Sequence, residues 1–259
     1  MGKIISISNQ KGGVGKTTTA INLAASLANL GRDVLIVDTD PQCNATSGVG
    51  IDKGNIEKNL YDVYSGSCPI EEAIIKTPFE RLHIIPASRR LVDVEIEHVN
   101  KERREWILSE ALNHIKNRFE YIIVDCPPSL GLLTLNSLVA ADSVMIPVQC
   151  EYFALEGLSL LAKTITNVQD SFNPSLELEG ILLTMYDTRN NLSVEVAAEV
   201  RSSYDAKVYT TIIPRNVVLA ESPSHGKPAM YYDIRSKGAQ SYISLAEEML
   251  GEKGLGQKA

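Results

Sequence analysis

The stretch Lys-Gly-Gly-Val-Gly-Lys-Thr-Thr-Thr, residues 11–19, constrains the fold of this chain more than any other segment. An apolar run, Ile4–Ile7, precedes it, and a helix-like segment, Thr18–Leu30, follows it. A strand, a glycine-rich turn and a helix N-terminus in this order are typical of a phosphate-binding loop. Glycines allow backbone conformations that a Cβ forbids, so main-chain N–H groups and the positive end of the helix dipole can converge on one anion.

The loop departs from the usual spacing G-x-x-x-x-G-K-[ST] at one position. Gln10 stands where the first glycine is expected, and an additional lysine, Lys11, follows it. Lys16 supplies a mobile charge for the β- and γ-phosphates, and the Thr17 hydroxyl stands where a Mg²⁺ ligand is needed. The sequence predicts that the nucleotide phosphates are bound by Lys11, Gly12, Gly13, Val14, Gly15, Lys16, Thr17 and Thr18.

Composition and charge narrow the class of protein. The chain has 259 residues, of which 44% are hydrophobic and 22% charged, as is ordinary for a soluble globular protein. Its formal net charge is −7, so binding to nucleic acid requires a local basic patch. No apolar run approaches membrane-spanning length, and no signal peptide precedes the first strand. We therefore expect a cytoplasmic protein.

Apolar runs alternate with helical patterns along the rest of the chain, which predicts an α/β fold with one doubly wound, mostly parallel sheet and helices on both faces. Residues 1–250 are expected to form a single P-loop domain, with 50–105 packed as helices over one edge and 251–259 as a flexible tail. The predicted core strands are Ile4–Ile7, Val34–Val37, Leu82–Pro86, Tyr121–Asp125, Ser143–Val148, Leu178–Thr184 and Val208–Ile213. The predicted helices include Thr18–Leu30, Arg103–Arg118, Leu155–Ser171, Ser193–Tyr204 and Ala239–Leu250.

Acidic residues stand at the ends of two predicted strands. Ile122–Asp125 is an apolar strand that ends in an acid, the Walker B form, and we expect the Asp125 carboxylate to hold Mg²⁺ opposite Thr17. Asp38 and Asp40 follow the second strand. Ligands in such sheets bind at the carboxyl ends of the strands, where these acids lie. Asp38 is equally consistent with a metal-site acid and with an acid that stabilises a turn.

Several segments together resemble the ParA/Soj-type chromosome or plasmid partitioning ATPases of the ParA/MinD superfamily, which carry a deviant Walker A loop. The resemblance runs from the first strand to about Tyr242 and implies slow, partner-stimulated hydrolysis of ATP to ADP and phosphate with Mg²⁺. Operator-binding helix-turn-helix regions of longer plasmid relatives are not expected here. The segments that carry the resemblance are Lys11–Thr19, Asp38–Gln42, Asp125–Pro128, Glu151–Gly157, Met185–Arg189 and Pro214–Gly226.

The resemblance also assigns roles to individual residues. It implies that Lys11 reaches the phosphates of a second subunit across a nucleotide-sandwich dimer, and that Asp40 orients the attacking water. Lys11, Lys16 and Asp40 are thus the expected catalytic residues, and Thr17, Asp40 and Asp125 the expected metal site. In the segment Pro214, Arg215 and Asn216, the proline would pack on adenine and the amide would hydrogen-bond to its edge.

The family further implies that an ATP-bound homodimer binds double-stranded DNA without sequence preference. A ParB-type centromere-binding partner would stimulate hydrolysis and release the DNA, so the protein would associate with the nucleoid. Arg189 aligns with a family position associated with DNA, although a solvated surface with scattered positive charge remains an alternative. The other candidate DNA contacts are Arg215, Lys227, Arg235 and Lys237.

Other classes of nucleotide-binding protein fit the sequence less well. A dinucleotide-binding oxidoreductase needs a third glycine where this chain has Thr18. A MinD-like ATPase that positions the division site shares the loop but needs a basic amphipathic C-terminal helix. Here the segment Ala239–Leu250 carries Glu247 and Glu248 and no Lys or Arg, so we expect no binding to anionic membranes.

Overall fold

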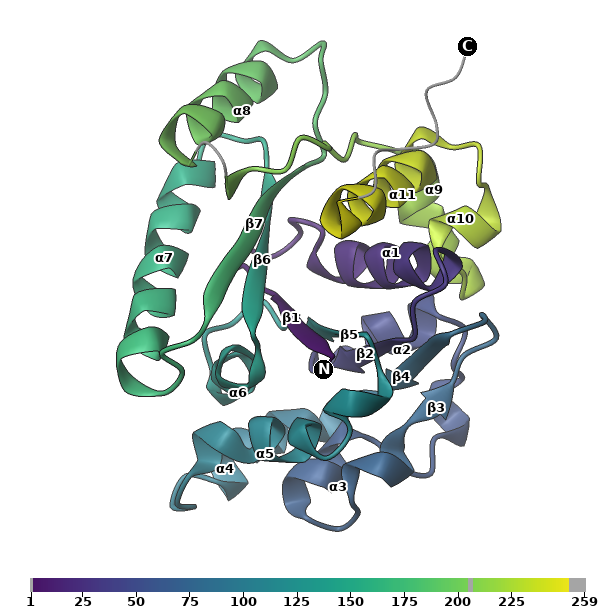
Figure 1. Ribbon diagram of the computed structural model, residues 1–259, viewed down its shortest axis with the longest axis vertical. Helices are drawn as coiled ribbons and strands as arrows, with labels where there is room; N and C mark the ends of the chain where they lie inside the picture. Colours follow the sequence, from purple (N-terminus) through teal and green to yellow (C-terminus); the bar gives the residue numbers. More distant parts are fainter. Residues whose placement is uncertain (1, 205–206, 252–259) are drawn as a thin grey trace.

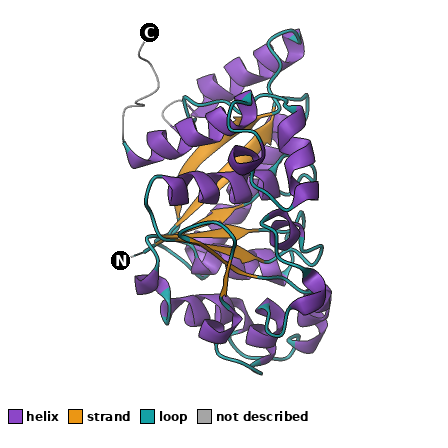
Figure 2. Cartoon of the chain, turned by 90° about the vertical axis from the view of Figure 1, so that its right-hand side faces the viewer, coloured by secondary structure: helices purple, strands orange, loops and turns teal. Residues whose placement is uncertain are grey.

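Within the described residues of the computed structural model, 2–204 and 207–251, seven strands form one sheet in the order β3-β4-β2-β5-β1-β6-β7. Helices cover both faces of this sheet, as the two perpendicular views show (Figures 1 and 2). All neighbouring strands pair in parallel except β3, which is antiparallel to β4 at the edge. The strands are β1 (Lys3–Ile7), β2 (Val34–Asp38), β3 (Ile75–Lys76), β4 (Leu82–Ile85), β5 (Tyr121–Asp125), β6 (Ser143–Gln149) and β7 (Glu177–Thr184). The predicted doubly wound architecture is confirmed.

The helices divide into two layers. One layer contains α1 (Lys16–Asn29), α2 (Asn44–Gly48), α9 (Val217–Glu221), α10 (Ala229–Tyr232) and α11 (Lys237–Leu250), with α11 packed along α1 (Figure 1). The other contains α3 (Leu60–Ser65), α4 (Val94–Glu97), α5 (Ile107–Asn113), α6 (Leu132–Ala140), α7 (Ala154–Ser171) and α8 (Asn191–Tyr204). Short 3₁₀ turns are η1 (Lys53–Asn55), η2 (Ile70–Ala73), η3 (Arg89–Asp93), η4 (Arg104–Trp106), η5 (Lys116–Arg118) and η7 (Ser222–His225). None of these helices is long and apolar enough to span a membrane.

The central strands are apolar on both faces because each face is covered by helices. Alternate residues of β2 pack into opposite cores. Leu35 packs under the layer that contains α3–α8, and Ile36 packs under the layer that contains α1 and α11. Every residue of β2 is buried, including the terminal Asp38. The all-apolar runs seen in the sequence therefore reflect strands in the middle of a three-layer structure.

The register of the sheet brings three strand ends to the same level. Ile7 of β1 is paired with Asp125 of β5, and Asp125 is paired in turn with Asp38 of β2. The phosphate loop begins directly after β1, so it lies beside the two acidic strand ends. This alignment positions the candidate site.

The predicted strand Val208–Ile213 is wrong. Within the described residues, Val208 forms one isolated bridge, to Ile181 of β7, and the other isolated bridge, between Pro214 and Tyr186, lies beyond the segment. Tyr209 N–H donates to Ile181 O and Ile213 N–H donates to Leu183 O, at 3.0 and 2.9 Å. Between them, the N–H groups of Thr210 and Thr211 donate to the Glu248 carboxylate on α11. Successive N–H groups of a strand point to opposite sides, so Thr211 N–H is the donor that a ladder continuing from Tyr209 would direct at β7, and its bond to Glu248 interrupts that ladder.

The predicted helix Arg103–Arg118 is also wrong in its extent. Arg103 takes a left-handed backbone conformation with φ 57°, and a 3₁₀ turn separates it from α5. A second 3₁₀ turn, Lys116–Arg118, follows α5. Only Ile107–Asn113 is α-helical. The predicted tail lies outside the described residues beyond Gly251, which ends α11 with φ 67°.

Candidate nucleotide site

The phosphate loop takes the conformation that its glycines allow. Gly13 and Gly15 have φ 76° and 93°, in the left-handed region that disfavours residues with a Cβ. Gly15 is the N-cap of α1, so the free N–H groups and the positive dipole end of this helix face the loop. The Val14 side chain is buried in the protein, which fixes the middle of the loop. The geometry is that of an anion cradle.

Lys16 is the charged group at the centre of the loop. Its side chain is largely buried, and its Nζ donates a hydrogen bond to the Lys11 carbonyl oxygen at 3.1 Å. Burial lowers the pKa of this ammonium, and the negative charge of the nearby Asp125 and Asp40 offsets part of that shift. An ammonium has three donors, and one of them is used by a carbonyl oxygen among the described residues, so donors remain for phosphate oxygens.

Asp125 is fully buried, and neither of its carboxylate oxygens accepts a hydrogen bond of ordinary geometry from the described residues. Burial is the main reason that its pKa is raised well above the usual value, and the neighbouring Asp38 charge raises it further. The nearby Thr17 hydroxyl offsets part of the shift. A buried carboxyl without a partner is stabilised either by a proton or by a bound cation. Asp125 and Thr17 therefore fit Mg²⁺, which takes few protein oxygens and completes its shell with phosphates and water.

The two acids that follow β2 have different surroundings. Asp38 accepts hydrogen bonds from the Thr46 N–H and hydroxyl, at 2.8 and 2.7 Å, and from the Asp40 N–H at 3.2 Å. Burial nevertheless raises the pKa of Asp38 to about 6. Because its oxygens are bound to the chain, Asp38 stabilises the turn into α2. Asp40 uses one oxygen to accept from Gln42 N–H and lies at the wall of the phosphate pocket.

Two adjoining pockets extend from the loop. A pocket of about 340 Å³ is formed by the glycines, Lys16, Thr17 and Asp40, together with Pro128 after β5. A second pocket of about 210 Å³ lies between the end of β7 and helices α9 and α11. Gly15, Thr18 and Met185 line both pockets. Phosphates and a base can therefore be held side by side.

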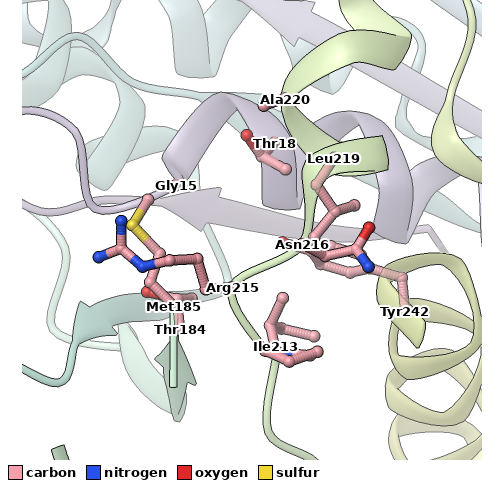
Figure 3. Close-up of a pocket in the computed structure, with 11 residues that line it drawn as sticks. Gly15, Thr18, Thr184, Met185, Ile213, Arg215, Asn216, Leu219, Ala220 and Tyr242 are labelled. Atoms are coloured by element: carbon pink, nitrogen blue, oxygen red, sulfur yellow. The ribbon is translucent and has the colours of Figure 1, made fainter. Parts of the chain in front are cut away.

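The second pocket contains the segment predicted to bind adenine. Pro214, Arg215 and Asn216 all line it, with Tyr242 of α11 on the same side as Asn216 (Figure 3). The Asn216 side-chain oxygen is buried and accepts no hydrogen bond from the described residues. An unpartnered amide oxygen in an apolar pocket suits a donor such as an amino group on a heterocyclic base.

Two residues that shape the site were not predicted from the sequence. Asn9 donates to Pro147 O at 2.8 Å and accepts from Lys11 N–H at 3.0 Å, which braces the start of the loop. The Thr184 hydroxyl donates to Val14 O at 2.8 Å and ties the end of β7 to the loop. Both residues lie at the carboxyl ends of strands, β1 and β7, where ligands bind in such sheets, and this position could have indicated their role.

The predicted residues do not all come together. Lys11 lies at the rim, where its Nζ is 3.1 Å from the Glu151 carboxylate, and it does not line the phosphate pocket. Arg189 is exposed but bound in two hydrogen bonds by Asp187, at 2.9 and 2.8 Å. Three other candidate DNA residues, also exposed, belong to the α9–α11 part of the chain: Lys227, Arg235 and Lys237.

Comparisons with known proteins agree with this geometry. A family profile described as an AAA domain matches residues 2–178. The chain is 55% identical over 249 residues to the sporulation initiation inhibitor protein Soj of Bacillus subtilis (strain 168), covering 96% of this chain and 98% of the relative. It is 54% identical to the chromosome partitioning protein ParA of Myxococcus xanthus (strain DK1622), covering 96% and 88%. Cobyrinic acid a,c-diamide synthase from Mycobacterium smegmatis, crystallised with ADP and magnesium, matches with a TM-score of 0.85 at 36% identity, covering 96% and 94%.

The fold and the site define a P-loop nucleoside triphosphatase with a deviant Walker A loop. High identity to Soj and ParA over nearly the full length specifies the family further. The chain belongs to the ParA/Soj family of chromosome-partitioning ATPases. It is accordingly an ATPase that uses ATP and Mg²⁺, and the resemblance seen in the sequence is confirmed.

Proposed function

We propose that the chain partitions DNA by cycling between an ATP-bound sandwich dimer that holds non-specific double-stranded DNA and a released state after hydrolysis. A ParB-type partner stimulates hydrolysis, and the protein works in the cytoplasm on the nucleoid. The observation that best supports this cycle is the position of Lys11. Its ammonium lies outside its own phosphate pocket, on a partly exposed rim, where the Glu151 carboxylate holds it at 3.1 Å and the phosphates of a second nucleotide would compete for it.

The residues of the site divide the work of phosphoryl transfer to water. Mg²⁺, when bound, neutralises developing phosphate charge, and Thr17 and Asp125 are the residues that hold it, with Asp40 beside them. Lys16 binds phosphate oxygens within the subunit, and Lys11 does so across the dimer. Asp40, one oxygen of which accepts no hydrogen bond from the described residues, orients the attacking water. Pro214 and Asn216 hold the base.

A valine at position 12 tests the sandwich. Gly12→Val should leave ATP affinity within about threefold of wild type but abolish the ATP-dependent dimer. A Cβ built on Gly12 meets one atom of the described residues within 4 Å, Pro128 Cβ at 3.9 Å, so the position has room for a Cβ within one subunit. In a sandwich the two loops face each other, and the added bulk would separate them. Light scattering with and without ATP measures the outcome.

Gly12→Ala is the matched control for this prediction, because it adds a single methyl group at the same position. Alanine should reduce dimer formation less than valine does. A normal ATP-dependent dimer of Gly12→Val would contradict the face-to-face arrangement of the loops. The nucleotide site would then stand without the sandwich.

The proposed DNA surface combines Arg189 with the exposed basic residues of the α9–α11 region. Arg189 is paired with the Asp187 carboxylate, and this pairing lowers the pKa of Asp187 to about 2. DNA phosphates would compete with Asp187 for the same guanidinium. Asp187 therefore limits the affinity of the dimer for DNA. A weakly bound dimer can move along the DNA.

Substitutions of this pair should change DNA affinity in opposite directions. With ATP bound, Arg189→Ala should weaken binding to non-specific duplex about threefold to tenfold and reduce the salt slope by about 1. Asp187→Ala should strengthen binding, because it releases the guanidinium. Arg118→Ala, at an exposed position near the amino end of β5, is the control and should change nothing. Titration at several salt concentrations measures the slope, and equal affinities for all four proteins would remove Arg189 from the surface.

A further inference from the structure

Met185 occupies the junction between the phosphate pocket and the base pocket. It follows β7 directly, and it lines both cavities together with Gly15 and Thr18. In Figure 3 its side chain extends from the end of β7 toward Gly15 of the loop, with Arg215 beside it.

The backbone at Met185 is held in an unfavourable conformation. Its φ is 51°, in the left-handed region that residues with a side chain rarely adopt. The flanking residues fix it from both sides: the Thr184 hydroxyl is bound to Val14 of the loop, and Tyr186 N–H donates to Ile213 O at 3.1 Å. Arg215 N–H then donates to Tyr186 O at 3.2 Å. Met185 therefore lies in a segment connected to both halves of the site.

We propose that Met185 is the residue that positions the sugar of the bound nucleotide. When the phosphates lie on the loop and the base lies against the Pro214–Asn216 segment, the sugar must cross the junction that Met185 lines. A thioether side chain offers a polarisable apolar surface that adapts to the face of a sugar ring. The strained backbone directs this side chain toward the loop, a use of strain that is common at ligand sites. The inference rests on the proposed placement of base and phosphates.

Three substitutions separate the side chain from the backbone. Met185→Ala removes most of the side chain, Met185→Gly also relieves the left-handed strain, and Met185→Leu keeps comparable apolar volume. Calorimetry would measure the affinities of full-length protein for Mg-ATP, Mg-ADP and inorganic tripolyphosphate. Leu192→Ala, on the exposed face of α8, is the control.

The proposal predicts that the alanine and glycine variants bind ATP and ADP about tenfold more weakly, by the same factor for both nucleotides. Tripolyphosphate, which has no sugar, should bind all variants as it binds wild type. The leucine variant should stay within about twofold of wild type for every ligand. This pattern isolates a contact with the nucleoside and requires no measurement of turnover or DNA binding.

Two results would overturn the proposal. Unchanged ATP affinity in both the alanine and glycine variants would show that the side chain makes no useful contact. An equal loss for tripolyphosphate and ATP would show that Met185 acts only by shaping the phosphate loop. Either result would leave the DNA-partitioning proposal intact. Conversely, if the wild type failed to dimerise with ATP, the partitioning proposal would fail but the Met185 contact would still stand.

Discussion

Alanine at position 16 should abolish measurable binding of Mg-ATP, which corresponds to a loss of at least about 100-fold in affinity. Lys16 is largely buried in the loop, and among the described residues its ammonium donates one hydrogen bond, to Lys11 O, so its other donors are available to phosphate. In the alanine variant the nucleotide phosphates would lie next to Asp125 and Asp40 without the Lys16 ammonium, whose positive charge offsets theirs. Calorimetric titration with Mg-ATP measures this loss.

Lys163→Ala is a suitable control for Lys16→Ala, because Lys163 is an exposed lysine on α7 outside both pockets. The control should bind Mg-ATP like the wild type and melt at the same temperature. Near-normal affinity in Lys16→Ala would mean that the loop does not bind the β- and γ-phosphates. The assignment of the whole phosphate pocket would then fail.

The second large effect concerns Asp125, where loss of function and gain of stability should coincide. Asp125→Asn should remove Mg²⁺-dependent hydrolysis and raise the stability of the nucleotide-free protein by about 1–3 kcal/mol. The wild-type carboxylate is fully buried and without a hydrogen-bond partner among the described residues, and Asn carries no charge to desolvate. Thermal melting should show a midpoint several degrees higher, at about 2–4 °C per kcal/mol for a chain of this size.

The pH dependence of this effect has a definite sign. Burial raises the pKa of Asp125 in the folded state above its ordinary value of 3.8. The protonated carboxyl is therefore favourable to folding at a pH below 3.8, and this contribution to the free energy of unfolding is lost as the pH rises through the folded-state pKa. The stability gap between Asp125→Asn and wild type should therefore widen from pH 4 toward neutrality. Saturating Mg-ATP should reverse the order, since only the wild type gains the metal contact. A destabilised nucleotide-free variant at pH 7 would contradict the account.

The sequence predicted those parts of the molecule that depend on local patterns. The loop glycines, the apolar run ending in Asp125 and the segment 214–216 each predict a local structure, and the parallel sheet brings them to one edge. Six of the seven predicted strands are present within the described residues. The predicted helix starting at Thr18 begins two residues earlier, at Lys16, because Gly15 provides its left-handed N-cap.

The failures have tertiary causes. Val208–Ile213 has the composition of a strand, but Glu248, distant in sequence, accepts the Thr211 N–H that a ladder with β7 would need. The role of Asp38 could not be read from its position, because the donors from Thr46 become its neighbours only after folding. The strained backbone of Met185 leaves no mark in the sequence, since methionine is not a residue associated with positive φ. Long-range contacts decide each of these points.

Binding of non-specific duplex DNA with ATP, with ADP and without nucleotide tests the central claim most directly. The wild type and Asp40→Ala, which should retain ATP without hydrolysing it, would be titrated at two salt concentrations. The account predicts binding only with ATP, persistent in Asp40→Ala and weaker at the higher salt concentration. Equal binding in all three nucleotide states, or none in any state, would contradict a nucleotide-gated DNA switch. If none is found, binding to anionic vesicles would test the division-site alternative.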